Sequence, residues 1–406
     1  MNILIFNCGS SSLTFKVLSV DQMENIRVVL SGKAHRVGVK GSKPSSIEYE
    51  HGGSRESVET PLDDHGQAAV LVLDKLGELG IKFDCIGHRW VHAAGYFQTA
   101  WVDAALLLRL KALVPILPVH HPAILRVIYA CRKALPKLPQ YVTADGAFHS
   151  TIPACASTYL LPKGLVKKYG FRKHGFHGLS YRYVVRKTAE TLGMFLPGSR
   201  IVACHLGTGG SSAVAVKNGE SVDTSMGYTA LSGLVMSTRS GDIDPILTLY
   251  LMAVFGYHPD DLMDMLNKKS GLLGISGFSS DIRDIIQRVG DDPQAKLAFE
   301  MYVYRLKKYI GSYVAVLGGL DVLVFTDDIG VHNWLVRERV CAGMDWCGVR
   351  LDTQANQRAS GDEIARLDAP DSKVRVLIVP TEEELVIGWE GIALMKGKQD
   401  AASLRS

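Results

Sequence analysis

The stretch Ile201–Ser212 reads IVACHLGTGGSS, and its pattern decides the fold that this chain is expected to adopt. Its apolar start predicts a buried strand ending at His205, and Ala213–Val216 predicts a second strand after the glycine-rich turn. Glycine permits positive φ and close approach to the backbone, so this turn could surround a small anion with N–H groups. An ordinary tight hairpin is the other interpretation.

The same arrangement occurs near the start of the chain. Ile3–Phe6 is apolar, Asn7–Ser12 reads NCGSSS, and Leu13–Leu18 is again rich in apolar residues. Two such loops could hold the two ends of a phosphate chain, and this duplication resembles the acetate and sugar kinase/Hsp70/actin group of folds. The chain contains no G-x-x-x-x-G-K-[ST] motif, and Gly207–Gly209 lacks the third glycine of a dinucleotide fingerprint.

Length and composition limit the classes of protein to which this chain can belong. The 406 residues suggest two or more domains, and the 47% hydrophobic and 21% charged content is typical of a globular protein with a sizeable core. A net charge of +4 is too small to argue for nucleic acid or an anionic membrane. No apolar run reaches membrane-spanning length, and the start lacks a basic signal-peptide region. The seven scattered cysteines suggest reduced thiols, so we expect a cytoplasmic protein.

Strand and helix patterns alternate along the chain, which predicts an α/β architecture. The beginning, residues 1–60, is expected to be rich in strands. Further strands are expected at 85–89, 141–144, 322–325 and 374–379. Helices are expected at 67–79, 104–114, 123–135, 180–192, 244–255, 259–267, 294–317 and 383–396. Loose segments are expected at 41–64, at 352–371 and after 398.

Several polar clusters follow predicted strands, which is where α/β proteins place their sites. The motifs are FNCGSSSLTFKV, GHRWVHAAG, PVHHP, DGAFHSTIP, YGFRKHGFHGLS, ACHLGTGGSS, DTSMGY, GLVMSTRSGDIDP, SGLLG, SDIRDI, FTDDIG and VPTEEEL. Read in this order, from residue 6 to residue 385, they closely resemble the acetate kinase family. The resemblance implies reversible phosphoryl transfer between a carboxylate and a phosphate donor, with acetyl phosphate as the product or the substrate.

The residues agree with such chemistry. A carboxylate nucleophile is ionised at neutral pH and needs no general base, whereas the many negative oxygens need cations and in-line positioning. The resemblance implies five catalytic residues: Arg89, His120, Asp145, His177 and Arg239. Asp145 would hold Mg²⁺ through water or orient Arg239. Asn7 and Glu383 match the family's metal ligands, so Mg²⁺ or Mn²⁺ is the expected cofactor.

Purely structural interpretations of the same residues remain open at this point. An arginine at a strand end is often a surface ion pair, and Asp145 could cap the following segment. Glu382–Glu384 could be an acidic first turn favoured by the helix dipole. His88, His92, His121, His149 and His205 are expected to be structural rather than catalytic.

The resemblance also implies two sets of binding residues. The acyl group is expected to contact Val91, Val119, Phe176 and Ala230, the last at a position where the family usually has proline. The phosphate and nucleotide side is expected to include Ser10, Ser12, Thr14, His205, Gly207, Thr208, Gly209, Gly210, Ser211, Asp281, Ile282, Arg283, Asp328, Ile329, Gly330, Val331 and His332.

Departures from the family pattern concern the phosphoryl partner. Thr14 stands where a lysine is usual, Thr208 where an asparagine is usual, and Asp328 where ATP-using members have glycine beside adenosine. These changes are similar to those of the pyrophosphate-dependent acetate kinases, so we favour pyrophosphate and phosphate over ATP and ADP. The alternative is that Asp328 accepts hydrogen bonds from a ribose.

The expected architecture is a duplicated, ribonuclease-H-like (actin-like ATPase) fold of two α/β domains with a central cleft. An acyl-substrate domain would comprise residues 1–147 and 386–406, and a phosphate-side and dimerisation domain residues 148–385. The resemblance implies a homodimer. Two other functions are considered on the same fold: a sugar or glycerol kinase, and a non-catalytic nucleotide sensor. A sugar or glycerol kinase would need a general base. A nucleotide sensor would not need the four residues Arg89, His177, Arg239 and Glu383 together.

Overall fold

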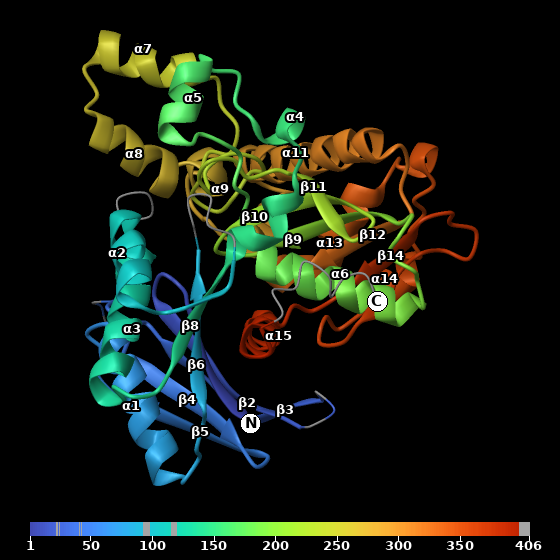
Figure 1. Cartoon of the computed structure of the whole chain (residues 1–406). Helices are drawn as coiled ribbons and strands as arrows, with labels where there is room; N and C mark the ends of the chain where they lie inside the picture. Colours follow the sequence, from blue (N-terminus) through green and yellow to red (C-terminus); the bar gives the residue numbers. More distant parts are fainter. Residues whose placement is uncertain are drawn as a thin grey trace. The chain divides into compact units, whose positions relative to one another are not determined.

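The computed structural model describes residues 1–21, 23, 25–39, 41, 43–91, 98–114 and 120–397. The chain divides into two compact units (Figure 1). The first comprises Met1–Ala147 together with the C-terminal segment that begins at Glu382, and the second comprises Phe148–Thr381. The returning segment therefore begins four residues before the boundary expected at 386.

The first unit is built on a sheet with the strand order β5-β4-β3-β2-β1-β6-β8-β7. Its strands are β1 (Asn2–Cys8), β2 (Ser12–Val20), β3 (Ile26–His35), β4 (Ser46–His51), β5 (Ser54–Glu59), β6 (Cys85–Trp90), β7 (Ala100–Trp101) and β8 (Gln140–Ala144). β1 pairs antiparallel with β2 and parallel with β6, which in turn is parallel to β8. Asn7 lies opposite Thr14 in the β1–β2 ladder, so the first predicted hairpin is present.

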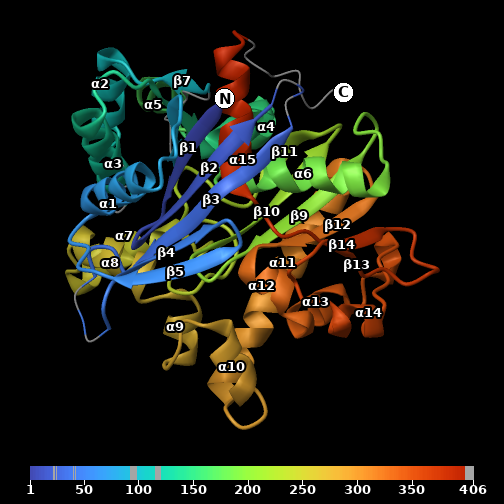
Figure 2. The ribbon, with the colours of Figure 1, turned by 90° about the horizontal axis from the view of Figure 1, so that it is seen from below.

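Helices cover this sheet. They are α1 (His65–Glu78), α2 (Ala104–Ala112), α3 (His121–Ala134) and the returning helix α15 (Glu383–Met395). α1 packs against α3, while α15 packs on β1, β2 and β6 (Figure 2). The apolar faces of α15 and β1 are buried together, so the two ends of the sequence share one core.

The second unit repeats the plan of the first. Its sheet has the order β11-β10-β9-β12-β14-β13. The strands are β9 (Arg200–Leu206), β10 (Ser211–Lys217), β11 (Glu220–Thr224), β12 (Val322–Thr326), β13 (Ala365–Arg366) and β14 (Arg375–Ile378). This order matches β3-β2-β1-β6-β8-β7 strand for strand, with the same parallel and antiparallel pairings, so the predicted duplication is confirmed.

The helices of the second unit are α4 (Ala154–Ser157), α5 (Lys163–Tyr169), α6 (Gly178–Leu192), α7 (Pro245–Phe255), α8 (Pro259–Lys268), α9 (Gly271–Ser276), α10 (Ile282–Arg288), α11 (Pro293–Leu317), α12 (Asp327–His332), α13 (Trp334–Cys341) and α14 (Thr353–Arg358). α11 is the longest of them. Asp292 caps its start by accepting from Gln294 N, and Leu306, Ile310 and Leu317 bury its apolar stripe.

Two expectations about loose segments are wrong. Residues 46–59 form the β4–β5 hairpin, in which β4 buries Ile47 and Tyr49 but β5 is exposed along its whole length and lacks a hydrophobic pattern. The segment 352–371 contains α14 and β13. Within the described ranges, no helix combines the length and apolar character needed to cross a membrane.

Candidate active site

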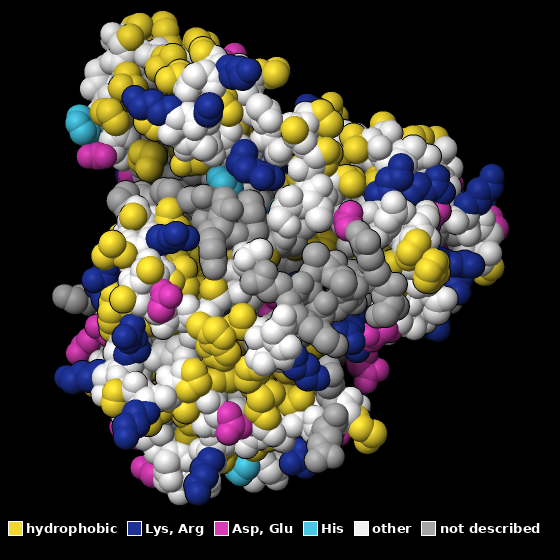
Figure 3. All heavy atoms as spheres, viewed as in Figure 1, with side chains coloured by type: hydrophobic (Ala, Val, Ile, Leu, Met, Phe, Trp, Pro, Cys, Tyr) yellow, Lys and Arg dark blue, Asp and Glu magenta, His cyan; other side chains and the backbone are white. Residues whose placement is uncertain are grey.

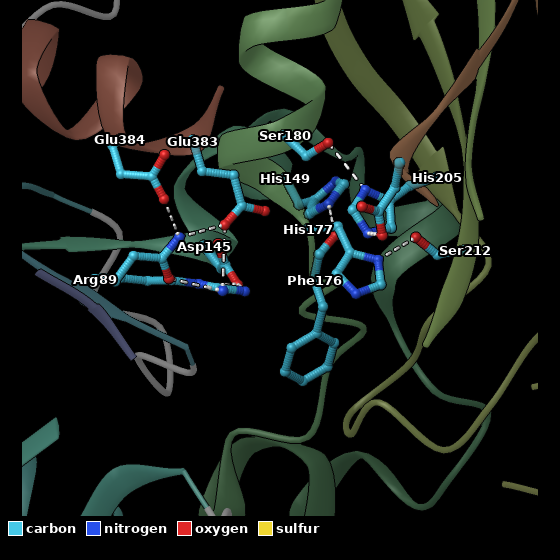
Figure 4. A network of polar contacts seen from close by, with 12 residues as sticks. Arg89, Asp145, His149, Phe176, His177, Ser180, His205, Ser212, Glu383 and Glu384 are labelled. Carbon is cyan, nitrogen blue, oxygen red and sulfur yellow. Dashed lines mark hydrogen bonds and ion pairs between the residues drawn. The ribbon is translucent and has the colours of Figure 1, made fainter. Parts of the chain in front are cut away.

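An ionic cluster lies at one edge of the first unit's sheet. Because β1, β6 and β8 are parallel, Asn7, Arg89 and Asp145 emerge at the same edge, and Glu383 begins α15 beside them (Figure 4). Arg89 donates from Nη2 to Asp145 Oδ2 at 2.6 Å and from Nε at 3.1 Å. Its Nη1 lies 3.1 Å from Asn7 Oδ1 and 3.2 Å from Glu383 Oε2.

Arg89 is therefore no surface ion pair. Its side chain is 15% exposed and that of Asp145 is 0% exposed. Burial alone would lower the pKa of Arg89, but the carboxylates of Asp145 and Glu383 outweigh burial and raise it. The guanidinium stays charged at every ordinary pH, which suits a group that binds negative oxygens.

The oxygens of this cluster fit a magnesium ion. Asp145 Oδ1 is buried and has no hydrogen-bond partner among the residues described, so it could accept from water bound to a metal. Asn7 adds an amide oxygen and Glu383 adds carboxylate oxygens. The two side chains are adjacent, with Asn7 Nδ2 2.9 Å from Glu383 Oε2. No three described His, Cys, Asp or Glu side chains form a complete metal cage. Mg²⁺ normally uses one or two carboxylates and completes its shell with water and phosphate oxygens.

Lys16 is a member of this cluster that sequence analysis did not identify. It forms ion pairs with Glu382 and with Glu384 Oε2, the latter at 3.3 Å. Burial lowers the pKa of Lys16, but Glu384 and Glu382 outweigh it, so the pKa is raised. Lys16 lies two residues after Thr14 on the same face of β2, and a lysine in an apolar strand was the available signal.

The glycine-rich hairpin of the second unit faces an unpaired arginine. Gly207 N and Gly210 N each donate to the other residue's carbonyl, at 3.2 and 3.3 Å, which closes a tight turn. A Cβ on Gly210 would lie 3.0 Å from Arg239 Nη1 and 3.8 Å from His177 Nε2. Both cation-forming side chains therefore approach the same point of the loop.

Arg239 has no carboxylate partner among the described residues. Its Nη1 lies 3.4 Å from Ala230 O and 3.8 Å from Met236 Sδ, both weak contacts. Burial lowers its pKa from the usual value, yet the group remains protonated near neutrality because a guanidinium starts so high. A largely buried cation without a counter-charge is suited to bind an anion.

His177 and His205 form a pair of histidines in the second unit (Figure 4). The rings of His177 and His205 stack with centroids 3.9 Å apart. His177 Nδ1 lies 2.8 Å from Ser212 Oγ, and His205 Nδ1 lies 2.9 Å from Ser180 Oγ. His205 Nε2 lies 3.0 Å from Asp327 Oδ2, and sequence analysis missed this carboxylate.

The expected nucleotide-side residues form a separate ionic group. Arg283 binds Asp281 bidentately, with Nη2 2.6 Å and Nε 2.9 Å from its two oxygens. Asp328 Oδ2 lies 3.5 Å from Arg283 Nη1, and its Oδ1 lies 3.6 Å from His332 Nδ1. The carbonyls of Gly330 and Val331 accept hydrogen bonds from Arg337, a buried residue of α13.

The remaining expected residues are distributed over both units. In the first unit, Ser10 lies in the β1–β2 turn, Ser12 is the first residue of β2, and His120 directly precedes α3. Val91 is buried there, and Phe176 is buried in the second unit. Val119 lies outside the described residues. His149, expected to be structural, contacts Ser221 Oγ and Phe176 O, both at 2.9 Å.

Comparisons with known proteins identify the family. A model described as the acetokinase family matches residues 2–389. The chain belongs to the acetokinase family. An acetate kinase of Thermotoga maritima is 42% identical over 397 residues, covering 95% of this chain and 97% of the relative. The predicted family is thereby confirmed.

Solved structures of the acetokinase family agree. The crystal structure of an acetate kinase from Entamoeba histolytica is 42% identical, with a TM-score of 0.86, over 98% of this chain and all of that one. A propionate kinase from Francisella tularensis has 34% identity and a TM-score of 0.86, over 96% and 98%. The predicted two-domain, actin-like fold class is confirmed, and the chain is a kinase that transfers phosphate to a carboxyl group.

Proposed function

We propose that this acetokinase catalyses reversible phosphoryl transfer between acetate and a phosphate donor, forming acetyl phosphate. The observation that supports it best is Arg239, a largely buried guanidinium that has no carboxylate partner in the part of the chain that the structure describes and approaches the glycine loop beside His177. The acetate oxygen attacks phosphorus without a general base because it is already ionised. Arg239 and His177 neutralise and orient the phosphoryl oxygens, and Arg89 binds the acyl phosphate's charge.

Magnesium is the cofactor we propose. Asn7, Asp145 and Glu383 would hold it, with Asp145 acting through water. When bound, the ion would neutralise phosphate oxygens. We propose that the methyl group of acetate is surrounded by Val91, Val119, Phe176 and Ala230. We also propose that the protein works in the cytoplasm.

We propose pyrophosphate and phosphate as the donor and acceptor pair. Asp328 contacts Arg283 and His332, so three side chains at expected nucleotide positions are engaged with one another. These contacts partly neutralise the charge of the Asp328 carboxylate. The side chain therefore opposes adenosine binding through its size more than through its charge. A diphosphate needs only the loop Gly207–Gly210 and the neighbouring cations.

The donor experiment supplies acetyl phosphate with either inorganic phosphate or ADP and follows its loss as a hydroxamate. We expect turnover with phosphate, pyrophosphate as the product, and little or no turnover with ADP. The variant Asp328→Gly should gain activity with ADP because the side chain is removed, whereas Asp362→Gly, an exposed control, should not. Efficient turnover of the wild type with ADP and none with phosphate would make Asp328 a ribose ligand instead.

We propose that the protein is a homodimer through α7. Ile246, Leu249, Val254 and Phe255 of this helix are between 57% and 63% exposed, and none of its residues is buried (Figure 3). An unbroken apolar helix surface of this kind is typical of a protein interface.

The dimer proposal predicts the mass of two chains in light scattering. Leu249→Asp should yield the mass of one chain, because a charge would be buried at the interface. Leu108→Asp on α2, a comparably exposed leucine, serves as the control and should leave the mass unchanged. A single-chain mass for the wild type would contradict the proposal.

A further inference from the structure

Asp327 adopts an unusual backbone conformation beside the histidine pair. It directly follows β12 and has a φ of +62°, and His177 has a φ of +58°. Four non-glycine residues in the described part of the chain have positive φ, and these two belong to the same hydrogen-bonded group. Such conformations are uncommon and unfavourable for residues other than glycine, so they gather where a particular geometry is needed for function.

The backbone conformation directs the Asp327 carboxylate toward the neighbouring strand. Thr326 pairs with His205 in the parallel β12–β9 ladder, so Asp327 stands just beyond its end. Its Oδ2 lies 3.0 Å from His205 Nε2. A Cβ on Gly207 would lie 2.0 Å from the same oxygen, so the carboxylate needs glycine at 207.

The contact fixes the His205 ring at both nitrogens. An ionised carboxylate only accepts hydrogen bonds, so the proton of this contact is on Nε2. The other nitrogen lies 2.9 Å from Ser180 Oγ. The His205 ring, held in this way, stacks on His177 at an interplanar angle of 23°. Ser212 Oγ contacts both His177 Nδ1 and, at 2.5 Å, Tyr181 OH.

We infer that Asp327 is a positioning residue, which orients His177 through His205. It touches no reacting atom in this arrangement. It holds the ring on which His177 stacks, and it lies at the start of α12 against the glycine loop after β9. This inference deepens the proposed function, because it assumes that His177 meets the transferred phosphoryl group.

The test compares Asp327→Ala, Asp327→Asn and Asp327→Gly. Loss of the carboxylate should lower kcat by about 10- to 100-fold in Asp327→Ala, with KM for acetyl phosphate changed less than about twofold, since misplacement of a catalytic group acts on the transition state. Asp327→Asn keeps an acceptor oxygen and should recover most of the rate. A kcat for Asp327→Ala within twofold of the wild type overturns the inference.

Asp327→Gly separates positioning from stability. Glycine tolerates positive φ, so this variant should melt at a higher temperature than Asp327→Ala and yet be equally slow. Asn218→Gly, at a φ of +57° in the β10–β11 turn, is the matched control and should keep wild-type kcat. If activity instead follows melting temperature, Asp327 is merely structural.

Nitrogen-15 NMR of the histidine rings provides a readout independent of turnover. The His205 Nε2–H signal, assigned with His205→Gln, should be slowly exchanging in the wild type and in Asp327→Asn. Asp327→Ala should lose it and shift the His177 resonances. Unshifted His177 resonances contradict the inference, whereas a wild-type enzyme inactive with both acceptors contradicts only the proposed function.

Discussion

Replacing Arg239 by alanine should lower kcat by about 10²–10³ while the protein stays folded, which is the usual cost of removing one preorganised charge donor. The fold should survive because Arg239 makes only weak contacts with Ala230 and Met236 and leaves no buried carboxylate behind. The measurement is kcat and KM for acetyl phosphate, with circular dichroism as the check on folding.

Three further variants sharpen this test. Arg239→Lys restores charge without the planar fork and should recover only part of the rate. Arg55→Ala, a surface arginine on β5, should be indistinguishable from the wild type. Arg89→Ala should lose turnover to a similar extent but should also unfold more easily, because Asp145 would be left buried and unpaired. A near wild-type kcat for Arg239→Ala would refute its assigned role.

Replacing Arg337 by methionine should destabilise the second unit by at least about 4 kcal/mol, because four buried oxygens lose their donor. Arg337 is fully buried and donates to Gly330 O at 2.9 Å, Val331 O at 2.6 Å, Asn356 Oδ1 at 2.7 Å and Asn356 O at 3.0 Å. Methionine fills the space but leaves these oxygens without donors, at about 1–3 kcal/mol each. Burial lowers the pKa of Arg337 to about 10, which still leaves it charged at neutral pH.

Urea-induced unfolding measures this loss. Arg339→Met, on the exposed side of the same helix α13, is the control and should change the unfolding free energy by less than about 0.5 kcal/mol. A change below 1 kcal/mol for Arg337→Met would mean that water replaces the lost donors. Helix α12 should also lose its shape, because two of the four acceptors, the carbonyls of Gly330 and Val331, belong to it.

Sequence patterns predicted the two hairpins, the long helix α11 and the polar residues at the strand ends, because hydrophobic periodicity and glycine-rich turns are local signals. Lys16 and Asp327 were missed because each acts through partners distant in sequence, and Arg337 was missed because its acceptors, Gly330 O, Val331 O and Asn356, show no pattern in the sequence. Lys16 reaches Glu382, 366 residues away, and Asp327 reaches a histidine on another strand. Ile47 and Tyr49 alternate with polar residues in β4, but β5 is exposed along its whole length and has no apolar face, so its pairing with β4 was not predicted.

The return of α15 to the first sheet has a consequence for synthesis on the ribosome. Asn7 contacts Glu383, which lies 376 positions later in the sequence, so the first unit's ionic cluster cannot form until almost the whole chain is translated. At about 5–20 residues per second, that delay is roughly 20–75 s. During this time the apolar surface of β1 that α15 later covers is a natural binding surface for chaperones. Nascent chains that stop before Glu383 would also lack a proposed metal ligand, so incomplete products should be inactive.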